Sequence, residues 1–107
     1  MPSNVHYLFD SSGRWVAFRI GKFVYNTKAN WIGWRPWDDA DVVDQRGRYL
    51  GSIAFGDRLF RFTGKPYRGY PGYPGYPGYP GYPGYPGFAG YCPLPPGASD
   101  VEIEEAG

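Results

Sequence analysis

A nine-residue pattern that occurs four times constrains the fold of this 107-residue chain more than any other feature of its sequence. The first copy, residues 8–16, reads Leu-Phe-Asp-Ser-Ser-Gly-Arg-Trp-Val, and the others occupy residues 24–32, 42–50 and 59–67. The central Asp or Asn suits the first position of a tight turn because its side chain accepts backbone N–H bonds. Gly suits the fourth position, where the backbone needs a positive φ. Each copy is therefore predicted to be a β-hairpin.

The residues that flank the turn repeat together with it. Phe9 faces Trp15 and Leu8 faces Val16 in the predicted register, and the next two copies give equivalent pairs. Adjacent strand residues point to opposite faces, so both faces of the sheet are apolar and a flat sheet with one wet face is excluded. A single hairpin is marginal in water, so the four hairpins are expected to bury one another. The aliphatic face would carry Leu8, Val16, Val24, Ile32, Val42, Leu50 and Leu59, and the aromatic face Phe9, Trp15, Tyr25, Trp31, Tyr49 and Phe60.

Copies two and four depart from the pattern. Ala29 stands where Gly is favoured, at a left-handed position that costs Ala about 1–2 kcal/mol, unless Asn30 adopts that conformation instead. In copy four, Arg61 would face Lys65, and Pro66 cannot donate to a ladder, so this hairpin is expected to be frayed. The predicted architecture is all-β, with eight short strands in four hairpins arranged as a closed or nearly closed pseudo-four-fold structure.

The repeated pattern G-x-x-V-Y-[DN]-x-x-G-R-[WY]-[IVL]-G resembles that of the 4-fold beta flower family. Residues 21–26, 31–33, 43–44 and 47–51 carry it, and residues 56–60 are also typical of it. The resemblance covers about residues 4–68, which we interpret as a four-hairpin domain. It implies a pseudo-four-fold all-β fold, and it brings no activity or catalytic residues to this chain.

Residues 69–107 form a second, low-complexity segment that ends in an acidic stretch. Six Gly-Tyr-Pro triplets occupy residues 69–86. Proline at every third position forbids ladders and helix interiors, which leaves polyproline II or a disordered chain with turns. In polyproline II the run would extend roughly 55 Å with its tyrosines along one edge. We expect a disordered tail whose candidate interaction residues are Tyr70, Tyr73, Tyr76, Tyr79, Tyr82 and Tyr85.

Charge divides the chain in the same place. The formal net charge of +1 combines +5 over residues 1–68 with −4 over residues 69–107. The acidic stretch 100–105 is therefore a candidate to dock on the basic body, along the frayed fourth hairpin. The basic charge is spread around hairpin turns and makes no concentrated stripe, so no nucleic-acid partner is expected.

No constellation of residues points to catalysis, a cofactor or a metal. Asp10 and Asp44 are interpreted as turn formers, and Asp38, Asp39 and Asp41 as a solvated loop in preference to a cation site. His6 is the sole histidine and Cys92 the sole cysteine. We therefore predict a protein that is not an enzyme.

The connection between copies two and three supplies the remaining candidates for a surface contact: Trp34, Arg35 and Trp37. The predicted function is a non-enzymatic protein-interaction module whose tyrosine- and proline-rich tail makes weak multivalent contacts. The alternative is a domain that takes a carbohydrate or a quaternary amine between aromatic hairpins. The sequence shows neither a signal peptide nor an apolar membrane span, so a cytoplasmic location is the default expectation. It specifies neither the partner nor the oligomeric state.

Overall fold

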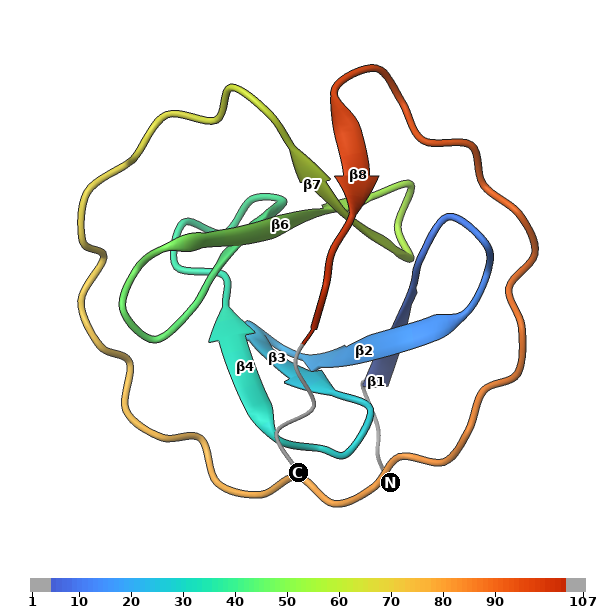
Figure 1. The fold of residues 1–107 in the computed structure, drawn as a ribbon. Helices are drawn as coiled ribbons and strands as arrows, with labels where there is room; N and C mark the ends of the chain where they lie inside the picture. Colours follow the sequence, from blue (N-terminus) through green and yellow to red (C-terminus); the bar gives the residue numbers. More distant parts are fainter. Residues whose placement is uncertain (1–4, 104–107) are drawn as a thin grey trace.

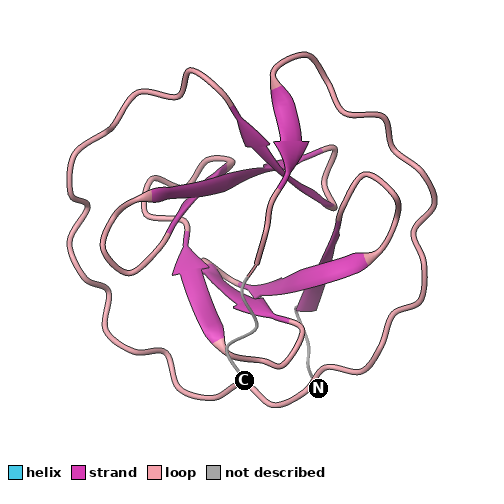
Figure 2. Cartoon of the chain, viewed as in Figure 1, coloured by secondary structure: helices cyan, strands magenta, loops and turns pink. Residues whose placement is uncertain are grey.

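The computed structural model describes residues 5–103, which form eight β-strands and, within that range, no helix (Figures 1 and 2). None of the described residues therefore belongs to a helix that could cross a membrane. The strands are β1 (Val5–Phe9), β2 (Trp15–Ile20), β3 (Phe23–Asn26), β4 (Trp31–Trp34), β5 (Asp41–Val43), β6 (Tyr49–Ala54), β7 (Arg58–Phe62) and β8 (Ala98–Asp100).

The first seven strands close into a barrel. Consecutive strands pair antiparallel from β1 to β7, and β1 also pairs with β7 in parallel, where Phe9 lies opposite Arg58. The Phe9 amide donates to the carbonyl of Asp57 at 2.8 Å across this junction. β8 is an additional strand that pairs antiparallel with β7. The all-β prediction is confirmed, with seven strands in the closed barrel and the eighth beside it.

The first three hairpins end in turns that share one hydrogen-bond pattern. In the first turn, Asp10 Oδ1 accepts from the amides of Ser12 and Arg14 at 3.0 and 2.9 Å, and the Gly13 amide donates to the Asp10 carbonyl. Asn26 and Asp44 organise the second and third turns in the same way. Ala29 itself takes the left-handed conformation, with φ 66°, so the bonds to Asn26 outweigh the strain.

A β-bulge alters one rung of the predicted register in each of these hairpins. Phe9 pairs with Trp15 as predicted, but Leu8 pairs with Ala17 and not with Val16. The same shift places Val24 opposite Gly33 and Val42 opposite Gly51. The extra residue strengthens the local twist that a small closed barrel requires.

Most of the two predicted apolar faces is found in two separate cores, but Tyr49 and Phe60, which were placed on the aromatic face, do not belong to the aromatic core. Small aliphatic side chains fill the centre of the barrel: Leu8, Ala17, Val24, Val42, Leu59 and Val101 are buried there. The aromatic cluster lies on the other face and contains Phe9, Trp15, Phe18 and Tyr25. Phe18 and Tyr25 stack at 5.1 Å between ring centroids.

The fourth hairpin is formed by β7 and β8, which corrects the prediction that residues 65–67 supply its second strand. Phe60 pairs with Asp100 and Phe62 with Ala98. Lys65 instead forms an ion pair with Asp41, which removes the unfavourable opposition of Arg61 and Lys65. Residues 63–97, which we call the strap, connect the two strands and encircle the barrel (Figure 1). Of the predicted acidic stretch 100–105, Asp100 pairs with Phe60 of β7 and Val101 packs in the aliphatic centre, whereas residues 104 and 105 lie outside the described part of the chain.

Candidate interaction surface

The strap lies against the barrel, where a disordered tail was expected. The six glycines of its triplets have φ between 87° and 96°, a conformation that glycine adopts without a steric penalty. The run therefore bends once per triplet and follows the barrel, which explains why it does not extend as straight polyproline II (Figure 1). Docking on the barrel gives this repetitive sequence a defined path.

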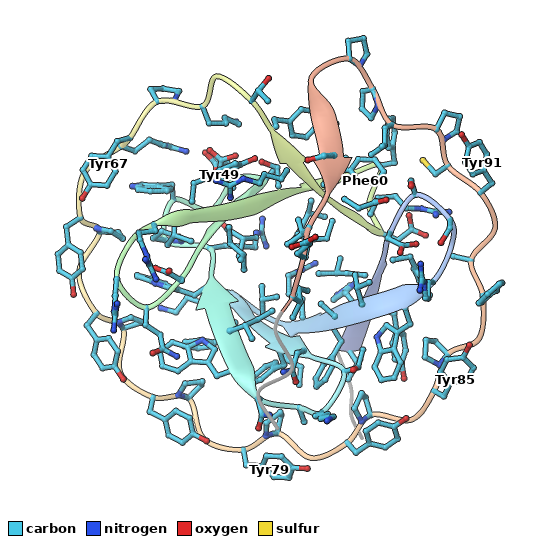
Figure 3. The ribbon with its side chains drawn as sticks, viewed as in Figure 1. Tyr49, Phe60, Tyr67, Tyr79, Tyr85 and Tyr91 are labelled. Carbon is cyan, nitrogen blue, oxygen red and sulfur yellow. The ribbon has the colours of Figure 1, made fainter. Side chains whose placement is uncertain are left out.

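The tyrosines of the strap point outward. Tyr67, Tyr79, Tyr85 and Tyr91 lie along the outer edge of the ring in Figure 3. The tyrosines of the six triplets are 57–65% exposed, while the intervening prolines and glycines are mostly half-buried. We call the exposed aromatic side chains of the strap the rim: Tyr67, Tyr70, Tyr73, Tyr76, Tyr79, Tyr82, Tyr85, Phe88 and Tyr91.

Two tryptophans of the barrel support the rim from beneath. Trp15 lies between Tyr82 and Tyr85, each at 5.9 Å between ring centroids. Trp31 lies between Tyr73 and Tyr76, each at 5.8 Å. The two tyrosine pairs are nine residues apart in the strap. A step of three triplets along the strap therefore matches a step of one hairpin around the barrel.

Both tryptophans are held by the strand that follows their turn. The Trp15 indole N–H donates to the carbonyl of Ala17 at 2.7 Å, and Trp31 makes the equivalent bond to Gly33 at 2.8 Å. The bulged hairpin thus fixes each indole ring in the same orientation. The hairpin repeat in the sequence is therefore also a repeat of strap-binding positions.

A charged cluster anchors the strap where it leaves β7, and we call it the entry clasp. Asp41 accepts from Lys65 at 2.9 Å and from Arg68 at 3.0 Å, and Arg68 also contacts Asp39 at 2.8 Å. Burial opposes ionisation of Asp41, but the hydrogen bonds from Lys65, Ser52 and Arg68 outweigh it and hold its pKa below the usual value. The entry clasp is therefore an ion-pair network around one nearly buried carboxylate.

A buried arginine anchors the other end, which we call the exit clasp. The Arg58 side chain is 8% exposed, and its Nη1 donates to the carbonyls of Asp10 at 2.9 Å and Gly90 at 2.8 Å. Its Nη2 donates to the carbonyl of Ala89 at 3.2 Å. The Ala89 amide in turn donates to the carbonyl of Gly13 at 2.9 Å. Arg58 thus joins the first turn, the barrel closure and the strap.

The predicted connection residues do not form one surface. Trp34 is 7% exposed in β4, and its indole N–H has no partner among the described residues. Arg35 donates from Nε to the carbonyl of Asp39 at 2.8 Å. Trp37 packs beneath Arg68, with the guanidinium 4.0 Å from the ring centroid. Arg35 and Trp37 thus support the loop and the entry clasp, and Trp34 offers almost no free surface.

Sequence reasoning did not identify Arg58 or the contacts of Trp15 and Trp31 with the strap. The tail repeats every three residues, so its sequence does not indicate which triplets contact which tryptophan. Asp39 and Asp41, which were weighed as cation ligands, bind Arg68 and Lys65 instead. Within residues 5–103, no three His, Cys, Asp or Glu side chains are grouped so that they could hold a metal.

Comparison with known proteins identifies the fold. A family model described as "4-fold beta flower protein" matches residues 3–99, which extends the resemblance noted over about residues 4–68 through the strap and most of β8. A search of curated proteins gave no significant match. A search of solved structures also gave none.

Proposed function

The chain belongs to the 4-fold beta flower family, and on the basis of its surface we propose that it is a non-enzymatic module that binds a protein partner through the tyrosine rim. The observation that carries this proposal is the outward display of nine aromatic side chains on one continuous segment. Aromatic residues, tyrosine above all, are enriched at protein interfaces and at their energetic hot spots.

The composition of the strap supports this function. Residues 69–99 contain no charged side chain, so the rim from Tyr70 to Tyr91 can be desolvated without removing an ion from water. Tyrosine has few rotatable bonds, and its ordering on binding costs little conformational entropy. A band of exposed tyrosines therefore offers contact area at low cost.

The attachment of the strap favours multivalent contacts. Because both clasps hold the strap on a closed barrel, the tyrosines are spaced before a partner arrives. Pre-organisation lowers the entropy cost of binding, and successive weak contacts reinforce one another. The partner would meet tyrosine rings rather than prolines, because the prolines are partly covered by the barrel. This distinguishes the rim from a free polyproline ligand.

The alternative function, binding of a carbohydrate or quaternary amine between aromatic hairpins, has less support. The aromatic surfaces of Trp15 and Trp31 are already in contact with the chain's own tyrosines. Trp15 is 8% exposed, so a small ligand would have to displace part of the strap to reach it.

The test is a quantitative affinity capture that compares three forms of the full chain. One is the wild type, the second carries Tyr67→Ser, Tyr79→Ser and Tyr91→Ser, and the third carries Phe55→Ser. Phe55 is 70% exposed on the turn before β7 and serves as the matched aromatic control. We expect the same partner to be captured by the wild type and the Phe55→Ser form, with at least a tenfold loss for the triple variant. Equal capture by all three forms would contradict the proposal.

A further inference from the structure

We propose that the barrel wall beneath the strap is itself a binding surface for Gly-Tyr-Pro segments, and that its partner in trans is the Gly-Tyr-Pro run of a second copy of this chain. This inference concerns the inner wall around Trp15 and Trp31, whereas the proposed function concerns the outer rim. The strap is then a ligand that the barrel binds within its own chain.

The wall presents the same binding unit more than once. Each unit is a tryptophan between two tyrosines of adjacent triplets, and Trp15 and Trp31 hold their tyrosines at nearly equal distances, 5.9 and 5.8 Å. The tyrosines that contact Trp15 lie nine positions after those that contact Trp31, and the two tryptophans belong to neighbouring hairpins. Because the triplets are identical, any Gly-Tyr-Pro segment of sufficient length offers this wall the same groups.

The turn glycines shape the wall for a close-lying backbone. A Cβ atom at Gly13 would lie 2.5 Å from the carbonyl oxygen of Gly90. A Cβ atom at Gly47 would lie 2.9 Å from Cδ of Pro71. The first and third hairpin turns therefore accept the strap only because they carry no side chain at these positions. Gly90 belongs to the exit clasp, so within the six triplets it is the approach of Pro71 to Gly47 that fits a Gly-Tyr-Pro segment.

The middle of the strap is attached by contacts that another segment can reproduce. The charged entry clasp and the Arg58 exit clasp use residues outside the six triplets, namely Lys65, Arg68, Ala89 and Gly90. Between the clasps, the triplets contribute ring contacts and the carbonyl of Pro83, which accepts from the Tyr7 hydroxyl at 2.9 Å. All of these groups are present in a second copy.

The charge of the chain permits two copies to approach. The run carries no charge and the whole chain has a formal net charge of +1, so repulsion between copies is weak. The chain's own strap competes at an effective concentration on the order of millimolar. Exchange between copies is therefore expected at millimolar protein, and a Gly-Tyr-Pro segment that keeps its tyrosines should bind more readily to a chain whose own inner tyrosines are removed.

The first experiment uses the full chain with Tyr73→Ser, Tyr76→Ser, Tyr82→Ser and Tyr85→Ser. These substitutions remove the tyrosine contacts of both tryptophans and leave both clasps unchanged. A peptide with the sequence of residues 69–86 is titrated in, and the indole N–H signals of Trp15 and Trp31 are followed by NMR. We expect saturable shifts of both signals, at least tenfold weaker binding to the wild type, and no binding of a peptide with serine in place of tyrosine. Unsaturable shifts, or equal shifts with the serine peptide, would overturn the proposal.

The second experiment tests exchange in the wild type and uses the rim variant as its control. Two samples of the wild type, labelled with different isotopes, are unfolded together and refolded at millimolar concentration. Cross-chain NOEs between strap tyrosines of one copy and Trp15 or Trp31 of the other are expected, and their disappearance on dilution would show exchange. Absence of cross-chain NOEs would contradict the exchange. The Tyr67, Tyr79 and Tyr91 triple variant should retain them, so failure of the rim function and failure of this inference are distinguishable.

Discussion

The barrel and the strap are ordered by different physical means. The barrel has continuous ladders and an aliphatic centre in which Leu8, Val24, Val42 and Leu59 are fully buried. The strap has no ladder between residues 63 and 97, and it is held by two clasps and by tryptophan–tyrosine contacts. A repetitive sequence with little structure of its own thus acquires a path by complementarity to a neighbouring surface.

The two ways of closing a hairpin show the cost of this arrangement. The first hairpin turns through the short connection that Asp10 and Gly13 define, whereas the fourth hairpin is closed by residues 63–97. Closing a loop of this length in place of a four-residue turn costs about 2 kcal/mol more in chain entropy. The strap contacts must offset that cost, so weakening them should destabilise β8 and the fourth hairpin first.

The largest expected effect is that of Arg58→Ala. Removing the guanidinium leaves the carbonyls of Asp10, Ala89 and Gly90 without this donor, with an expected loss of about 3 kcal/mol in the free energy of unfolding. Urea denaturation measures it. The control is Arg61→Ala on the same strand, whose exposed side chain donates to the Tyr49 carbonyl and should cost under about 1 kcal/mol. Similar losses for both would contradict the role of the exit clasp.

A comparison of two glycines separates backbone strain from strap binding. Gly13 and Gly56 have similar φ, 91° and 84°, but only a Cβ at Gly13 meets the strap; none of the described atoms lies within 4 Å of a Cβ at Gly56. Gly56→Ala should cost about 1–2 kcal/mol for the left-handed conformation alone. Gly13→Ala should lower the free energy of unfolding by at least about 1 kcal/mol more than Gly56→Ala does, and it should increase amide exchange at Ala89 and Cys92. Equal losses in thermal unfolding would show that the approach of Gly90 contributes nothing.

The correspondence of three triplets to one hairpin is tested by deleting residues 78–80. The deletion shortens the strap by one triplet between its two tryptophan contacts, so Trp15 and Trp31 cannot both keep their tyrosine pairs. Each lost ring contact is worth roughly 0.5–1.5 kcal/mol, and we expect a loss of about 1–2 kcal/mol. Tyr79→Ser, which keeps the length, should have little effect on stability. If calorimetry shows the same melting temperature for the deletion and the wild type, the register argument is wrong.

The smallest effect concerns pH and the entry clasp. Because the pKa of Asp41 is lower in the folded protein than its ordinary value of 3.8, its ionisation stabilises the fold above that value. That contribution is lost as the pH falls through the folded-state pKa. Its size should be under about 1 kcal/mol, because Lys65 and Arg68 are partly exposed and screened by solvent.

The measurement compares the wild type with Asp41→Asn by urea denaturation between neutral pH and pH 2. The difference in stability should be largest at neutral pH and should shrink below about pH 4. Asp38→Asn, in the exposed loop that precedes β5, is the control and should follow the wild type. A difference that does not vary with pH would show that Asp41 acts through packing rather than charge.

The sequence by itself determined the features that depend on neighbouring residues. Asp10, Asn26 and Asp44 specify three similar turns, because a short side chain can reach the amides two and four positions ahead. The alternation of aliphatic and aromatic residues specified the two cores, because strand side chains alternate between faces. The composition of the triplets excluded helix and sheet because proline lacks the required amide.

Tertiary structure alone decided what joins distant parts of the chain. The second strand of the fourth hairpin is β8 and not residues 65–67. Lys65 forms an ion pair with Asp41 instead, and Val101, which follows β8, completes the aliphatic centre. The role of Arg58 depends on carbonyls about thirty positions ahead and nearly fifty behind, which no local pattern contains. The path of the strap likewise depends on the circumference of a closed barrel, because identical triplets carry no information about where each one should bind.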